Sequence, residues 1–128
     1  MSYNPTSLYL EAEATTIPRL KLVRMMYAGA IESLQTAKAR LQENDRPGFV
    51  RSINKSQNIV AELALSLDFE QGGDIAIRLN ALYEWLQRTL TPACLEGKTE
   101  PIDDAVLVLT KLSEAWESIR DDDMGFSL

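Results

Sequence analysis

The sequence predicts an all-α fold, an antiparallel up-down bundle of four helices with a short N-terminal arm. In two long segments, apolar residues recur at alternating spacings of three and four, as they do on the buried face of a bundled helix. No segment of useful length alternates between apolar and polar residues, which would indicate a β-strand. Short breaker segments separate the helical patterns, so consecutive helices are expected to lie antiparallel.

The first helix is predicted to run from near Pro18 to about residues 43–44. Proline suits the first position of a helix because the backbone N–H that it lacks would be unpaired there in any residue. Residues 45–48 form a cluster of breakers that serves as the first loop. The apolar stripe of this helix comprises Leu20, Val23, Tyr27, Ala30, Leu34, Ala37 and Leu41.

The second helix is predicted from about Pro47 to Leu67. Ser56 or Gln57 fills a gap in its apolar face, and Asn58 is expected to make a hydrogen bond within the bundle. The apolar face comprises Phe49, Ile53, Val60, Leu63 and Leu67.

The third helix is predicted to begin after a loop at residues 68–74. Gly72 and Gly73 can supply a positive φ for that turn, and Asp74 is a suitable N-cap. The helix is expected to reach about Leu90, because the residue before Pro92 avoids the α conformation. Its stripe is Ile75, Leu79, Leu82, Tyr83, Leu86 and Leu90, with Ile77 and Trp85 outside it.

The fourth helix is predicted to begin near Pro101, with Asp103 and Asp104 in a first turn that favours negative charge. Its stripe is Ile102, Ala105, Leu109, Leu112, Trp116 and Ile119. The 128 residues are expected to form one domain, in which residues 1–16 are an N-terminal arm and residues 121–128 a C-terminal tail.

The composition argues against several classes of function. The chain has no histidine, so it cannot contain a Ser-His-Asp triad, a Cys-His pair or a histidine metal site. Its acidic residues fall on predicted solvent faces, and no glycine-rich phosphate loop is present. Cys94, the only cysteine, is expected to be an apolar filler or a loop residue. We therefore expect no enzyme activity, no metal and no cofactor.

The charge and the hydropathy pattern limit the partners. A net charge of −6 repels phosphate backbones, which argues against nucleic acid. The longest apolar run is far shorter than the roughly 20 residues that cross a membrane. The chain does not start with a basic segment and an apolar run, so no signal peptide is predicted and the cytoplasm is favoured.

The segment 59–67 is apolar around most of its helical circumference, more than a helix packed on one side requires. The surplus must meet either more of the same chain or a partner. The predicted hairpin of the second and third helices is therefore expected to form both the centre of the core and one wall of a binding surface.

The order of several segments resembles the flagellar secretion chaperone family FliS. Asn4-Pro5 is followed by Tyr9, and four longer segments come after them. They are LVRMMYAGA at 22–30, KSQNIVAELALSLD at 55–68, LNALYEWL at 79–86 and AWESI at 115–119. Thr91-Pro92 departs from the family pattern, in which the third helix usually continues.

The resemblance implies a chaperone that binds the C-terminal segment of flagellin in apolar grooves, prevents premature polymerisation and aids flagellar type III secretion. It makes an export-gate component a second candidate partner. Trp116 is expected in the core. The implied partner-binding residues, each of which could equally be bundle core, are Tyr9, Ile59, Leu63, Leu67, Leu79, Leu82 and Tyr83. The alternative is an adaptor whose apolar face forms a homodimer or binds a flagellar regulator.

Overall fold

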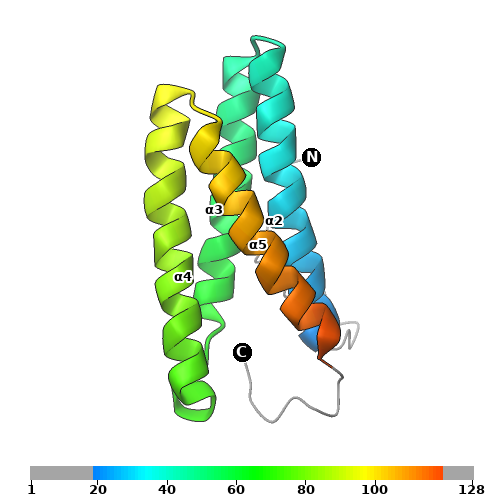
Figure 1. The fold of residues 1–128 in the computed structure, drawn as a ribbon, viewed down its shortest axis with the longest axis vertical. Helices are drawn as coiled ribbons and strands as arrows, with labels where there is room; N and C mark the ends of the chain where they lie inside the picture. Colours follow the sequence, from blue (N-terminus) through cyan, green and yellow to red (C-terminus); the bar gives the residue numbers. More distant parts are fainter. Residues whose placement is uncertain (1–18, 120–128) are drawn as a thin grey trace.

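The computed structural model describes residues 19–119, which form four helices and no strand. The helices are α2 (Arg19–Gln42), α3 (Arg46–Leu65), α4 (Phe69–Glu96) and α5 (Glu100–Ser118). Consecutive helices run antiparallel, and α5 crosses the bundle obliquely (Figure 1). Both α2 and α4 pack against α3 and α5, so the four helices form a closed ring. The predicted all-α four-helix bundle is confirmed.

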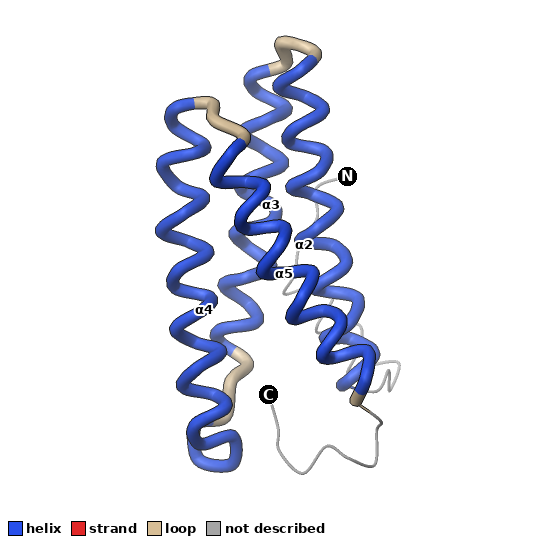
Figure 2. Tube along the Cα trace, viewed as in Figure 1, coloured by secondary structure: helices blue, strands red, loops and turns tan. Residues whose placement is uncertain are grey.

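Short loops join the helices at the two ends of the bundle (Figure 2). The predicted arm, with Tyr9, and the predicted tail lie outside the described residues, as does the predicted helix start at Pro18. The C-terminal end of α2, both ends of α3 and the start of α5 lie within a few residues of the predicted positions.

The heptad stripes of α2 and α5 form much of the core. In α2 the stripe is buried from Leu20 to Ala37, and Leu41 is half-buried. Trp116 of α5 is buried as predicted, and its ring lies 6.4 Å from that of Tyr27. Ser56 fills the gap in the face of α3, where its hydroxyl donates to the carbonyl of Ala30 at 3.1 Å. These contacts join three helices around one apolar interior.

Helix α4 begins at Phe69, six residues before Ile75, the first helical residue that an N-cap at Asp74 predicts. The carboxylate of Asp68 accepts hydrogen bonds from the backbone N–H groups of Glu70 and Gln71, at 3.0 and 3.1 Å. This cap allows a helical turn to form before Gly73, which interrupts the helix with φ 50° and ψ −126°. The prediction of a loop up to Asp74 was therefore wrong, although a glycine does break the helix there.

Helix α4 also continues past the predicted end at Leu90, through Pro92 to Glu96. Leu90 and Ala93 are buried on either side of the proline and hold the helix against the core. Pro92 itself is exposed, so water can bond to the backbone carbonyl that loses its partner there. The helix ends at Gly97, whose φ of 69° is left-handed. The buried hydrogen bond predicted for Asn58 was also wrong, because Asn58 is exposed.

Two arginines hold the C-terminal ends of helices, where backbone carbonyls lack partners. Arg24 of α2 donates to the carbonyl of Trp116 at 3.1 and 3.2 Å and to that of Ile119 at 2.5 Å. Arg46 of α3 donates to the carbonyl of Leu95 at 2.8 Å. A Cβ atom at Gly97 would lie 2.6 Å from the Arg46 guanidinium, so this approach also requires glycine.

Candidate binding groove between α3 and α4

A groove of about 430 Å³ lies between α3 and α4, and we refer to it as the α3–α4 groove. It combines apolar side chains from α3 with mostly polar ones from α4. Its lining residues are Val60, Ala61, Ala64 and Leu65 from α3, and Asn80, Tyr83, Glu84 and Gln87 from α4. A groove of this kind suits an amphipathic segment with one apolar face.

The α3 wall exists because small side chains alternate with large ones. Ala61 and Ala64 leave room between the helices, while the buried Val60 and Tyr83 form the floor. Leu65 forms a rim and is 79% exposed. Covering such an exposed aliphatic side chain with a partner removes apolar surface from water and therefore favours binding.

The α4 wall is polar and held by hydrogen bonds. The side-chain amide of Asn80 donates to Glu84 Oε1 at 3.3 Å, and Arg88 lies 4.0 Å from the same carboxylate group. The side-chain amide of Gln87 donates to the backbone carbonyl of Gln57 at 2.9 Å. This wall can therefore orient a bound segment, while the α3 wall supplies apolar contact.

Exposed apolar side chains concentrate at the hairpin that joins α3 to α4. Besides Leu65, they include Phe69, Ile75 and Ile77, which are 50 to 59% exposed. Ile77 lies three residues before Asn80 on α4, so the two share one helical face. The α3–α4 groove thus opens at this end onto further apolar surface.

The structure separates the predicted partner-binding residues into three groups. Ile59, Leu63 and Leu79 are buried in the core. Leu67 and Leu82 are half-buried. Among the predicted residues that lie within 19–119, Tyr83 alone lines the groove, although it is only 1% exposed.

Sequence reasoning missed most of the residues that form the walls. Ala61, Ala64 and Leu65 lie in the apolar run singled out for its surplus apolar surface, and the small alanines three apart were a usable signal of a groove. The polar wall of α4 carried no comparable signal, because polar residues at helical spacing also mark any solvent-exposed face.

A buried pair of tyrosines supports the groove floor. The hydroxyl groups of Tyr27 and Tyr83 lie 2.6 Å apart. Burial raises the pKa of Tyr27 above its ordinary value, against the opposing effect of its hydrogen bonds with Tyr83 and Trp116. Burial also raises the pKa of Tyr83, and the nearby Tyr27 raises it further. Both phenols therefore stay protonated at neutral pH, as a shared hydrogen bond between two hydroxyls requires.

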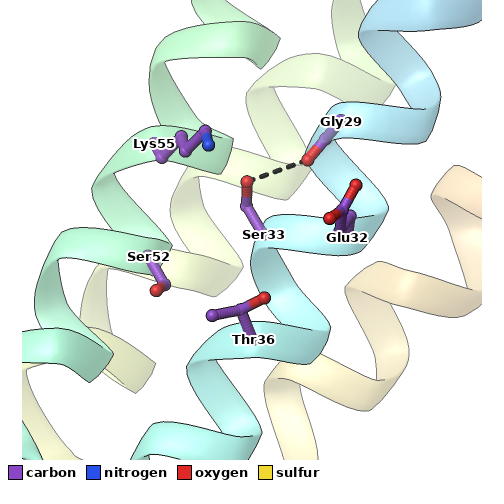
Figure 3. A pocket seen from close by; sticks show the side chains of 6 residues that line it. All are labelled: Gly29, Glu32, Ser33, Thr36, Ser52 and Lys55. Carbon is purple, nitrogen blue, oxygen red and sulfur yellow. Dashed lines mark hydrogen bonds between the residues drawn. The ribbon is translucent and has the colours of Figure 1, made fainter. Parts of the chain in front are cut away.

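A second, smaller pocket of about 180 Å³ lies between α2 and α3. Figure 3 shows its polar lining, which comprises Gly29, Glu32, Ser33, Thr36, Ser52 and Lys55. The hydroxyl of Ser33 donates to the backbone carbonyl of Gly29 at 2.8 Å. A serine nucleophile would instead donate to a general base. The size and apolar wall of the α3–α4 groove make that groove the better candidate for a macromolecular partner.

Residues 19–119 contain neither a group of metal-binding side chains nor a helix that could span a membrane. Among these residues, no three histidine, cysteine, aspartate or glutamate side chains are grouped so that they could hold a metal ion. None of the four helices is both long enough and apolar enough to cross a membrane.

Comparisons with known proteins give a consistent result. The family model described as flagellar protein FliS matches residues 2–123. A flagellar secretion chaperone FliS from Vibrio cholerae is 33% identical over 99 residues, which cover 77% of this chain and 73% of the relative. The corresponding protein of Salmonella typhimurium is 32% identical over 100 residues, which cover 77% and 74%.

A third relative extends the similarity over most of the chain. The flagellar secretion chaperone FliS of Campylobacter jejuni is 28% identical over 123 residues, which cover 96% of this chain and 94% of the relative. The four-helix bundle agrees with the fold that the family resemblance implied. The chain therefore belongs to the FliS family.

Proposed function

We propose that the chain is a cytoplasmic flagellar export chaperone that binds the C-terminal segment of flagellin. Binding prevents premature polymerisation of flagellin and aids its secretion by the flagellar type III apparatus. The relatives are named flagellar secretion chaperones, which supports the role in export. The observation that carries the proposal is the α3–α4 groove, which has an apolar wall and the exposed Leu65 on its rim.

The groove fits a client that folds as it binds. A flexible segment can lay the apolar face of a helix on Ala61, Ala64 and Leu65 while its polar face stays in water. Ordering such a segment consumes part of the interaction free energy. Binding of this type is therefore reversible, as release of the client for export requires.

The predicted partner-binding residues take different parts in this proposal. Tyr83 contacts the client from the groove floor, and Leu67 and Leu82 contact it at the edges. Ile59, Leu63 and Leu79 lie beneath the surface and fix the spacing of α3 and α4. Tyr9, in the N-terminal arm, contributes a further apolar contact to the same client.

Calorimetric titration with a peptide that covers the last few dozen residues of flagellin from the same organism tests the proposal. We expect saturable one-to-one binding with a large negative heat-capacity change, because apolar surface leaves water. The absence of heat, together with separate elution of peptide and protein, would refute flagellin binding. The proposed role requires no catalysis, metal or cofactor.

A second function is favoured by the exposed Phe69, Ile75 and Ile77 at the hairpin. This apolar surface also suits a homodimer, a flagellar regulator or a component of the export gate. Sedimentation over a range of protein concentrations separates the first case from the others. A concentration-dependent dimer that Ile77→Glu abolishes would support self-association.

A further inference from the structure

A hydrogen-bonded amide bridge joins α3 and α4 at one end of the α3–α4 groove. The side-chain amide of Gln57 donates to Thr91 Oγ1 at 3.0 Å. The side-chain amide of Gln87 donates to the backbone carbonyl of Gln57 at 2.9 Å. We refer to Gln57, Gln87 and Thr91 as the amide bridge.

The amide bridge makes the two ends of the α3–α4 groove chemically different. Gln57 precedes the α3 lining by one helical turn, and Gln87 is the last lining residue on α4. From Asn80 to Gln87 the α4 wall is about 10 Å long, at a rise of about 1.5 Å per residue. Since α3 and α4 are antiparallel (Figure 1), the amide bridge lies at one end of this wall. The other end leads to the exposed Ile77.

The two ends therefore place opposite demands on a bound helix. Near Leu65 and Ile77, an apolar client side chain covers exposed apolar surface. At the amide bridge, the side-chain nitrogen of each glutamine uses one of its two N–H groups in a hydrogen bond that joins the helices. The side-chain oxygens of both glutamines lose water when a client covers them, and a polar partner must replace it.

We propose that the amide bridge sets the register of the client helix, because it requires a polar side chain or a helix end opposite Gln87. This inference rests on the proposed function and names Gln87 as a specificity-determining residue of the chaperone. Apolar contact then extends for about two helical turns from the hairpin, and sliding the client by one turn towards the amide bridge is disfavoured.

The test is a scan of the flagellin C-terminal peptide, in which each polar residue is changed singly to leucine. Calorimetric titration measures the affinity of every peptide for the full chain and for two variants. Gln87→Met keeps the side-chain length and removes the amide. Gln35→Met is the matched control, because Gln35 is exposed on α2 and does not line the groove.

We expect leucine at one peptide position to weaken binding to the unaltered chain about tenfold, as burial of an unpaired amide does. Gln87→Met should remove that penalty at the same position, and Gln35→Met should retain it. Gln87→Glu, which keeps a polar atom at the groove, should also retain it.

The outcomes distinguish the two proposals. An unchanged penalty in Gln87→Met would show that the amide bridge only ties the helices together, and it would overturn the register role alone. Failure of the unaltered chain to bind any peptide would overturn flagellin binding and the register role together. If Gln87→Met does not fold, two other results would overturn the inference. Either no leucine substitution in the peptide weakens binding to the unaltered chain, or the weakening disappears in Gln87→Glu.

Discussion

The hydroxyl groups of Tyr27 and Tyr83 meet at 2.6 Å across the diagonal of the bundle. Their helices, α2 and α4, each pack on α3 and α5, so this hydrogen bond crosses the interior of the ring. It lies directly beneath the α3–α4 groove, because Tyr83 also lines the groove floor. The stability of the core and the shape of the proposed binding site therefore depend on the same side chain.

Changing Tyr27 to phenylalanine leaves the Tyr83 hydroxyl buried without this partner, whereas Tyr83→Phe leaves Tyr27 with only its hydrogen bond to Trp116. We expect Tyr27→Phe and Tyr83→Phe each to lower the free energy of unfolding by about 1–3 kcal/mol. The double variant should lose less than the sum, because it leaves no orphaned hydroxyl. Urea denaturation of all four proteins measures this coupling, and strictly additive losses would contradict it.

The same pair predicts a loss of stability at alkaline pH. Below the ordinary tyrosine pKa of about 10, the phenols are protonated in both the folded and the unfolded chain. Above it, the unfolded chain releases protons that the folded chain retains, because burial raises the pKa of both groups. Stability should then fall with rising pH by about 1.4 kcal/mol per pH unit for each tyrosine.

Urea denaturation at a series of pH values above about 9 measures this slope. The double variant Tyr27→Phe/Tyr83→Phe is the control, because it keeps every lysine and arginine while it removes both buried phenols. Identical slopes for the double variant and the unaltered chain would contradict the assignment.

Arg24 should stabilise the C-terminal end of α5. Arg24→Met removes the donors to the carbonyls of Trp116 and Ile119 and keeps much of the apolar stem. We expect a loss of roughly 1–2 kcal/mol, and only partial recovery in Arg24→Lys, which lacks the planar fork of donors. Hydrogen exchange should accelerate in the last turn of α5. Arg51→Met, at an exposed position of α3, should leave that turn protected.

Leu65 should contribute to client binding without contributing much to folding. Leu65→Glu places a charge on the rim of the α3–α4 groove, so we expect the affinity for the flagellin segment to fall at least about tenfold. Because Leu65 is 79% exposed, the free energy of unfolding should change by less than about 0.5 kcal/mol. Leu107→Glu, exposed on α5, is the control and should bind normally. Equal affinities for the two variants would remove Leu65 from the site.

Pro92 interrupts the hydrogen bonding of α4 at an exposed position. Pro92→Ala should raise the free energy of unfolding by about 1–3 kcal/mol, because it restores a backbone donor and relieves the contact of the ring with the preceding turn. Thermal and urea denaturation measure this gain. A destabilised Pro92→Ala variant would show that the helix geometry at this point depends on the proline.

The helices and most of the core could be predicted because burial in a bundle imposes a strict spacing, which the stripe from Leu20 to Ala37 follows. The ends of α4 could not be predicted by the same rule. Its start depends on the competition between two possible caps, Asp68 and Asp74, and its continuation depends on Pro92 facing solvent. Both are properties of the packed chain rather than of the local sequence.

The floor of the candidate site and the apolar character of its α3 wall were partly predictable, but its polar α4 wall was not. Within one apolar run, Leu63 is buried and Leu65 is 79% exposed, although both are leucines of the same helix. Apolar residues that pack in a core and those that line a groove recur at the same helical spacing. The distinction depends on where α4 lies, and Tyr83 shows that one residue can belong to both.

The ring of helices has a consequence for the order in which the chain folds. Helices α2 and α3 share the most extensive interface and are neighbours in sequence, so this hairpin can form early during synthesis. The interface of α2 with α5 is different, because Arg24 and Trp116 are 92 positions apart. Until α5 leaves the ribosome, the side of α2 that faces it remains uncovered. A protein proposed to shield the apolar segment of a client thus exposes an apolar stripe of its own until its last helix docks.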